Sequence, residues 1–101
     1  MDPQAAEVHI LAKLRKGLPA NRSYHCYDHT LDVYRTAITI AAAEGVSGED
    51  LDLLKTAALF HDSGFLIRDD EHELGSCGIA RETLPAFGYS SVQIERICTM
   101  I

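Results

Sequence analysis

Apolar residues recur along this chain at intervals of three and four, the spacing of a helix with one buried face. No segment alternates apolar and polar residues for more than a few positions, so strands are not expected. The pattern predicts helices over about 4–16, 27–44 and 47–62, a fourth ending near residue 84 and a last one over about 90–101. We therefore predict an all-α fold, a compact bundle of about five helices.

Polar residues at the predicted helix starts support these boundaries. Asp2 is placed to accept from the exposed N–H groups of the first helix. Ser47 with Asp50, and Ser90 with Gln93, have the spacing of a capping box, in which two side chains satisfy each other's backbone N–H groups. We expect both pairs to cap the helices that they open.

Two of the predicted helices contain enough apolar residues to be largely buried. The second helix carries them along two stripes, one with Leu31, Tyr34, Ile38 and Ala41 and the other with Val33, Ala37 and Ile40. Apolar residues on most of its sides predict burial. The third helix ends in residues 57–60, which are apolar all round, so we expect it to pass through the centre of the bundle.

Composition and charge limit the class of partner. A chain of 101 residues fits one domain and no second one, and 47% hydrophobic with 24% charged residues is typical of a globular protein. Nine Lys and Arg against fifteen Asp and Glu give a net charge of -6, which argues against long nucleic acid as a partner. A small anionic substrate is compatible, because a bound dication and nearby basic side chains set the field inside a cleft.

The predicted location is cytoplasmic. The three cysteines, Cys26, Cys77 and Cys98, are scattered and odd in number, which favours a reducing compartment over a disulfide scaffold. No apolar run approaches the roughly 20 residues that cross a bilayer, and the first residues lack a secretory signal, so no membrane partner is expected. The pattern does not specify an oligomeric state.

Two polar residues, His61 and Asp62, follow directly after the most apolar stretch of the chain, residues 56–60. A carboxylate near a core loses hydration worth several kcal/mol unless a cation or several hydrogen bonds replace the water. A divalent metal is the most compact replacement. The alternative is a solvated turn that merely ends the helix before Gly64.

A second group of polar residues stands at the start of the second helix. His25 and His29 are four residues apart, so if both are helical their Cβ atoms lie about 5–6 Å apart on one face. The alternative is an exposed helix start, capped by Asp28, with both rings solvated. Together with His61 and Asp62, however, these histidines predict a metal site near the ends of two buried helices.

Both stretches resemble the signature of a known family. Residues 24–30, Tyr-His-Cys-Tyr-Asp-His-Thr, and residues 57–65, Ala-Ala-Leu-Phe-His-Asp-Ser-Gly-Phe, are similar to the two motifs of the HD domain family of metal-dependent phosphohydrolases. In that family a lone histidine, an adjacent His-Asp pair and a distant aspartate hold a divalent metal. The resemblance covers about residues 20–101 and implies the all-helical HD fold.

The resemblance also assigns roles to individual residues. It implies that His29, His61 and Asp62 are the first three metal ligands, and that His25 and Asp62 serve in catalysis. His25 matches the position of a general acid in the cyclic-nucleotide phosphodiesterase branch of the superfamily. His72 is a candidate for a second metal or for substrate, because some HD proteins use further histidines downstream of the pair; the alternative is an exposed helix start.

Two histidines with one or two carboxylates suit Mn, Fe, Co, Ni or Zn, whereas Mg is less favoured because it prefers oxygen ligands. The predicted function is hydrolysis of a small phosphate ester, nucleotides included, by a water that the metal activates. A proton from His25 to the departing oxygen would contribute typically about 10²- to 10⁴-fold. Arg22, Lys55 and Arg68 are the nearest basic residues in sequence that could meet the phosphate.

One element of the family pattern is missing. After Asp62 the chain contains only Asp69 and Asp70, which fall in a predicted loop and do not fit the position of the family's last ligand. We therefore expect residues 1–101 to be a single HD-like domain that is incomplete at its C-terminus. The alternative function is a non-catalytic metal- or ligand-binding helical module, inactive without the fourth ligand. Oxidative chemistry at a di-iron centre is a third option, but it requires more ligands than the chain offers.

Overall fold

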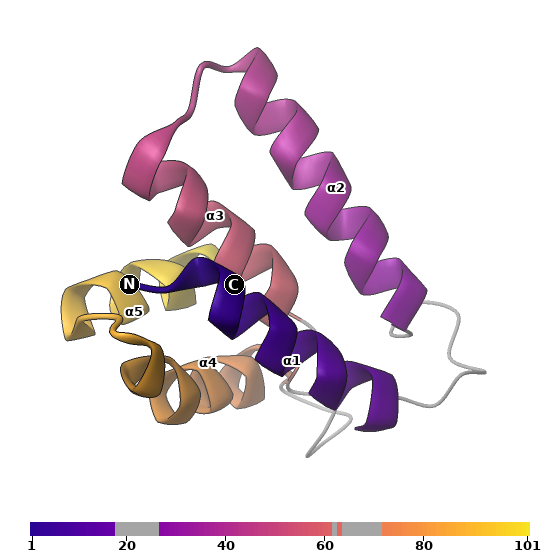
Figure 1. Ribbon diagram of the computed structural model, residues 1–101, viewed down its shortest axis with the longest axis vertical. Helices are drawn as coiled ribbons and strands as arrows, with labels where there is room; N and C mark the ends of the chain where they lie inside the picture. The colour runs from indigo at the N-terminus through magenta and orange to yellow at the C-terminus, as the bar shows by residue number, and fades with distance from the viewer. Residues whose placement is uncertain (18–26, 62, 64–71) are drawn as a thin grey trace.

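The helices predicted from the sequence are present in the computed structural model, which describes residues 1–17, 27–61, 63 and 72–101; for residues 27–29, 72 and 73 it describes the backbone alone. The chain forms α1 (Pro3–Gly17), α2 (Tyr27–Ala43), α3 (Gly48–Phe60), α4 (His72–Thr83), a 3₁₀ turn η2 (Leu84–Phe87) and α5 (Ser91–Met100) (Figure 1). None of the described residues forms a strand, so the all-α prediction is confirmed. Within the same residues, every helix is too short or too polar to cross a bilayer.

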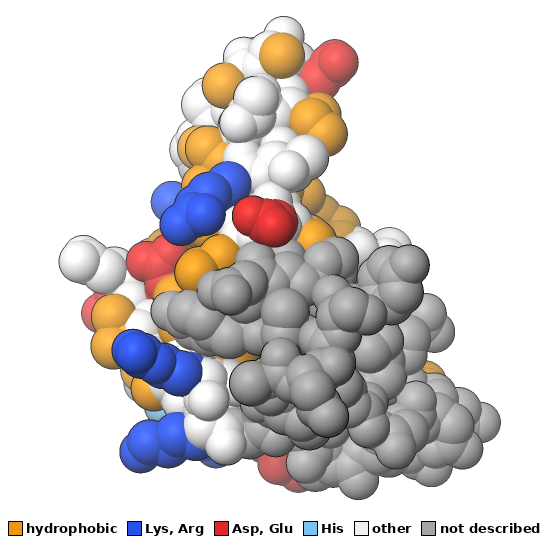
Figure 2. All heavy atoms as spheres, turned by 90° about the vertical axis from the view of Figure 1, so that its right-hand side faces the viewer, with side chains coloured by type: hydrophobic (Ala, Val, Ile, Leu, Met, Phe, Trp, Pro, Cys, Tyr) orange, Lys and Arg blue, Asp and Glu red, His pale blue; other side chains and the backbone are white. Residues whose placement is uncertain are grey.

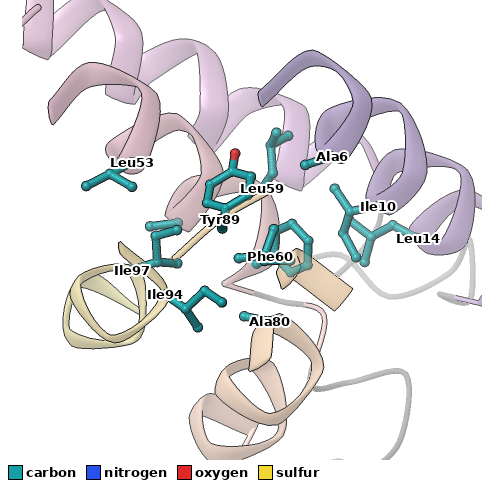
Figure 3. Packing of buried hydrophobic residues seen from close by; sticks show 12 residues of the cluster. Ala6, Ile10, Leu14, Leu53, Leu59, Phe60, Ala80, Tyr89, Ile94 and Ile97 are labelled. Carbon is teal, nitrogen blue, oxygen red and sulfur yellow. The ribbon is translucent and has the colours of Figure 1, made fainter. Parts of the chain in front are cut away.

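Helix α3 occupies the centre of the fold, as predicted, because α1, α2, α4 and α5 all pack against it. Its last turns are buried on every side, and Phe60 is fully enclosed. The buried cluster around it draws on every helix except α2 and is shown in Figure 3; its members are Ala6, Ile10, Leu14, Leu53, Ala57, Leu59, Phe60, Ala80, Leu84, Tyr89, Ile94 and Ile97. Burying each of the larger side chains contributes about 1.5–3 kcal/mol.

Helices α1 and α5 begin as the sequence predicts. The Asp2 carboxylate accepts from the backbone N–H of Ala5 at 3.1 Å. At the start of α5, Ser90 Oγ accepts from the N–H of Gln93 at 3.2 Å, and Gln93 Oε1 accepts from the N–H of Ser90 at 2.8 Å. The capping box at Ser90 is therefore confirmed.

The capping box predicted at Ser47 is wrong, although Ser47 is the N-cap residue of α3. Its side chain makes no hydrogen bond to the helix start. The next residue, Gly48, has a left-handed backbone with φ of 61°. The carboxylate of Asp50, which should reach back to Ser47, instead accepts from Arg96 of α5 at 2.7 Å. A partner distant in sequence therefore replaces the local one.

Helix α2 is less buried than its two apolar stripes suggest. It packs mainly against α3 and to a smaller extent against α1. Thr30 and Ala41 are buried, but Val33 and Ala37 are only partly covered and Ile40 is 56% exposed. At the top of the view in Figure 2, where α2 forms the surface, hydrophobic side chains are exposed. The prediction that this helix is buried on most sides is therefore wrong for the second stripe.

Candidate metal site

The start of α2 and the end of α3 lie at the same end of a helix pair. The two helices pack together and are joined by residues 44–47, so they run in opposite directions (Figure 1). At about 1.5 Å per residue, His29 lies about 21 Å along α2 from its last residue, and His61 about 20 Å from the start of α3. The backbone thus brings His29 and His61 to one level, as a shared metal requires.

The ring of His61 is held in one tautomer. His61 directly follows α3 and is partly buried, and its Nδ1 lies 2.6 Å from the carbonyl oxygen of Ala58. Because a carbonyl oxygen can only accept, Nδ1 must carry the hydrogen, and a neutral ring then has its lone pair on Nε2. A histidine that binds a metal through Nε2 usually donates its other N–H to a carbonyl or carboxylate in this way.

Two buried serines fix the backbone on either side of His61. Ser63 Oγ donates to the carbonyl of Phe60, and Ser76 Oγ donates to the carbonyl of His61, each at 2.7 Å. Both serines are fully buried. Because Ser76 belongs to α4, its bond attaches the first turns of that helix to the end of α3. His72 stands one helical turn before Ser76, so its backbone belongs to the same end of the molecule.

Several of the predicted site residues lie outside the described residues. These are His25, Asp62, Asp69 and Asp70, together with the side chains of His29 and His72. Their roles as ligands or as a general acid therefore stay predictions. Among the side chains that are described, no three of the His, Cys, Asp and Glu type come together at a possible metal position. The tautomer of His61 is the observation that fits a metal here.

Sequence reasoning did not single out the hydroxyl of Thr30, the residue directly after His29. Its side chain is fully buried, and within the described part of the chain its Oγ1 has no hydrogen-bond partner. Leaving a buried hydroxyl unpaired costs about 1–3 kcal/mol, so native proteins seldom do it away from functional sites. In the sequence, only the position of Thr30 directly after His29 could have drawn attention to it, because a threonine within a helix has no other distinguishing feature.

Lys55 lies on α3 beside Tyr34 of α2. Its Nζ sits 5.9 Å from the centroid of the Tyr34 ring. Both residues line a cavity of about 400 Å³ between α1, α2 and α3, together with the carboxylates of Glu7 and Asp52. Burial, followed by a hydrogen bond with Glu7, raises the pKa of Tyr34. Two carboxylates around Lys55 make this an unfavourable position for a substrate phosphate.

Comparison with known families supports the resemblance read from the two motifs. The family model of the HD domain matches residues 26–101, a range that begins one residue after His25 and includes His29, His61 and Asp62. Neither the curated proteins nor the solved structures provide a match to the chain.

Proposed function

The chain belongs to the HD domain family, a superfamily of metal-dependent phosphohydrolases, and from this premise we propose that it hydrolyses a small phosphate ester, nucleotides included. The observation that carries the proposal is the fixed ring of His61 at the end shared by α2 and α3. A net charge of -6 further favours a small substrate over long nucleic acid.

In this proposal His29, His61 and Asp62 hold a divalent ion of the Mn, Fe, Co, Ni or Zn type. When bound, such an ion supplies an activated water and neutralises negative charge on the phosphoryl group. The carbonyl of Ala58 keeps the hydrogen of His61 on Nδ1 and makes its Nε2 more basic.

The other residues support or complete this arrangement. Ser63 and Ser76 restrain the backbone at Phe60 and His61, so the ring of His61 starts from a fixed position. In the same proposal His25 gives a proton to the departing oxygen, and His72 meets either the substrate or a second ion. These two roles rest on the family resemblance.

The sequence offers one reason to consider a binding module without catalysis. No aspartate follows Asp70, so the position of the family's last ligand is not filled by any residue up to Ile101. In this alternative, a metal held by fewer protein side chains has a structural or regulatory role, and the site binds a small molecule without turnover. Metal content and hydrolysis must therefore be measured separately.

The test compares metal binding and hydrolysis in the intact chain and in two ligand variants. The protein is loaded with Mn²⁺ or Ni²⁺, its metal content is measured, and phosphomonoesters, phosphodiesters and nucleotides are offered as substrates. His61→Ala and Asp62→Ala should each lower metal affinity and hydrolysis by more than about 100-fold, since even residues behind the ligands contribute about 10–100-fold. His9→Ala is the matched control, because this histidine is not a predicted ligand: its ring packs against that of Phe87, with 5.4 Å between the centroids.

Each result has a defined meaning. Hydrolysis that persists in both ligand variants would show that the chemistry lies elsewhere. Bound metal without turnover on any substrate supports the binding module. A protein that takes up no metal, although circular dichroism shows it to be folded, contradicts both.

A further inference from the structure

Two thiols face each other where α4 packs against α5. Cys77 Sγ lies 3.6 Å from the carbonyl oxygen of Cys98, and Cys98 Sγ lies 3.9 Å from that of Cys77. Both thiols are free and partly exposed. Because each sulfur reaches the other residue's backbone, the two cysteines stand directly opposite each other.

The packing around the thiols keeps them in this register. One helical turn away on each helix, Arg81 and Glu95 form two parallel hydrogen bonds of 2.9 Å across the same interface. Beneath them, Ala80, Ile94 and Ile97 are buried in the core. To form a cross-link in this register, the sulfurs would turn from the carbonyls toward each other by rotation about the Cα–Cβ bonds.

We propose that Cys77 and Cys98 form a redox-modification site, at which a low-molecular-weight disulfide such as oxidised glutathione converts the two thiols into a cross-link between α4 and α5. One protein thiolate attacks a sulfur of the oxidant, which forms a mixed disulfide and releases one thiol. The second protein thiolate then attacks the protein sulfur of that mixed disulfide and releases the other thiol. Two protein thiols are oxidised, and one small disulfide is reduced to two small thiols.

The environment of Cys98 slows the step in which this thiol is the attacking group. Burial and the neighbouring Cys77 raise the pKa of Cys98 to about 11, whereas the charge of Arg81 acts in the opposite direction. Only the thiolate attacks, so the step that Cys98 carries out should become faster as the pH rises. Partial exposure of both thiols lets a small oxidant reach them.

The cross-link would act on the segment that supports His61. Cys77 directly follows Ser76, whose hydroxyl binds the carbonyl of His61. Tying Cys77 to α5 therefore restrains the part of α4 that holds the end of α3. It also closes a loop over residues 77–98 and so constrains the unfolded chain, which stabilises the folded one.

The experiment uses the full chain with Cys26→Ser, which leaves only the two facing thiols. It is equilibrated with mixtures of reduced and oxidised glutathione, quenched with acid and analysed by intact mass and peptide mapping. The expected result is loss of two hydrogens per chain, with a peptide containing Cys77 linked to one containing Cys98. Tm should rise by about 10 °C on oxidation and return when a reductant is added.

Single variants and a non-reducing gel distinguish this cross-link from glutathione adducts and from disulfides between chains. With Cys26→Ser also present, Cys77→Ser and Cys98→Ser should each gain one glutathione and show no rise in Tm. The proposal is overturned if the Cys26→Ser protein takes up one glutathione on each thiol. It is equally overturned if the thiols stay reduced under oxidising mixtures, or if the disulfide joins two chains on the gel.

Discussion

Four serine and threonine side chains are buried among the described residues, and they differ in how their oxygens are satisfied. Ser63 and Ser76 donate to carbonyls at the end of α3. Thr56 donates to the carbonyl of Asp52 at 2.9 Å and shares a 2.7 Å hydrogen bond with the hydroxyl of Tyr89. Thr30 has no such partner within the same residues. Its hydroxyl therefore lowers the stability of the fold beside the predicted ligand His29.

Replacing Thr30 by valine keeps the shape of the side chain and removes the unpaired oxygen. Thr30→Val should raise the free energy of unfolding by about 1 kcal/mol, measured by urea denaturation. The control is Thr39→Val on the same helix, whose exposed hydroxyl donates to the carbonyl of Arg35. That variant should change stability by no more than about 0.5 kcal/mol. If Thr30→Val instead lowers the free energy of unfolding by more than about 1 kcal/mol, the hydroxyl of Thr30 has a hydrogen-bond partner.

At the scale of elements, α5 is attached to its neighbours through its first turns. Its capping box closes the helix start, and the side chains next in line bind α3. Gln93 donates to Glu49 at 2.5 Å, and Arg96 donates to Asp50 at 2.7 Å. These pairs are exposed and contribute little free energy, so their main effect is on the register of the two helices.

The two serines that begin α3 and α5 should respond differently to the same substitution. Ser90→Ala should lower the free energy of unfolding by about 1 kcal/mol, because the cap oxygen that accepts from Gln93 is lost. Ser47→Ala is the matched control, since its side chain makes no cap bond, and should cost less than about 0.5 kcal/mol. Equal losses in thermal or urea unfolding would contradict the assignment of a single capping box.

The same serines show what can be predicted from sequence. Helix positions follow from the spacing of apolar residues, and the observed bounds lie close to the predicted ones. A capping box forms only if the side chain three positions after the serine hydrogen-bonds back to the serine. Gln93 accepts from the N–H of Ser90, whereas Asp50 accepts from Arg96, which is 46 positions away. Apolar spacing on α2 likewise predicted the helix but not which stripe is covered, because that depends on where the neighbouring helices pack.

The candidate site divides in a similar way. The motifs identify His29, His61 and Asp62 as a group, and the helix pair brings the first two to one level. The carbonyl that orients His61 and the serine that ties α4 to it were not predictable, because neither contact has a sequence signature. They depend on the turn after Phe60 and on the packing of α4.

At the scale of the whole molecule, three acidic groups among the described residues hold their protons more tightly in the folded chain than in the unfolded one. Burial raises the pKa of Cys98, of Tyr34 and of Tyr89; the hydrogen bond from Thr56 partly opposes the shift at Tyr89. At alkaline pH the folded state therefore binds more protons than the unfolded state. Under that condition stability must fall as the pH rises.

Stability should decline on the alkaline side. The loss begins as the pH passes the ordinary cysteine value of 9.0 and continues until the raised value of Cys98, about 11, is exceeded. Urea unfolding under a reductant at increasing pH measures this decline. Cys98→Ser should remove the part of the decline that begins near pH 9.0, whereas Tyr89→Phe should leave that part unchanged. A free energy of unfolding that stays level up to pH 11 would disagree with the buried positions of these groups.

The last turn of α3 ends in carbonyl groups that the helix itself cannot satisfy. Those of Ala58, Phe60 and His61 are each occupied by a side-chain donor, namely the ring of His61 and the hydroxyls of Ser63 and Ser76. The C-terminal end of a helix carries partial negative charge, which would repel a phosphate. With its oxygens turned to protein donors, this end of α3 presents a weaker electrostatic barrier to an anion than a bare helix terminus would.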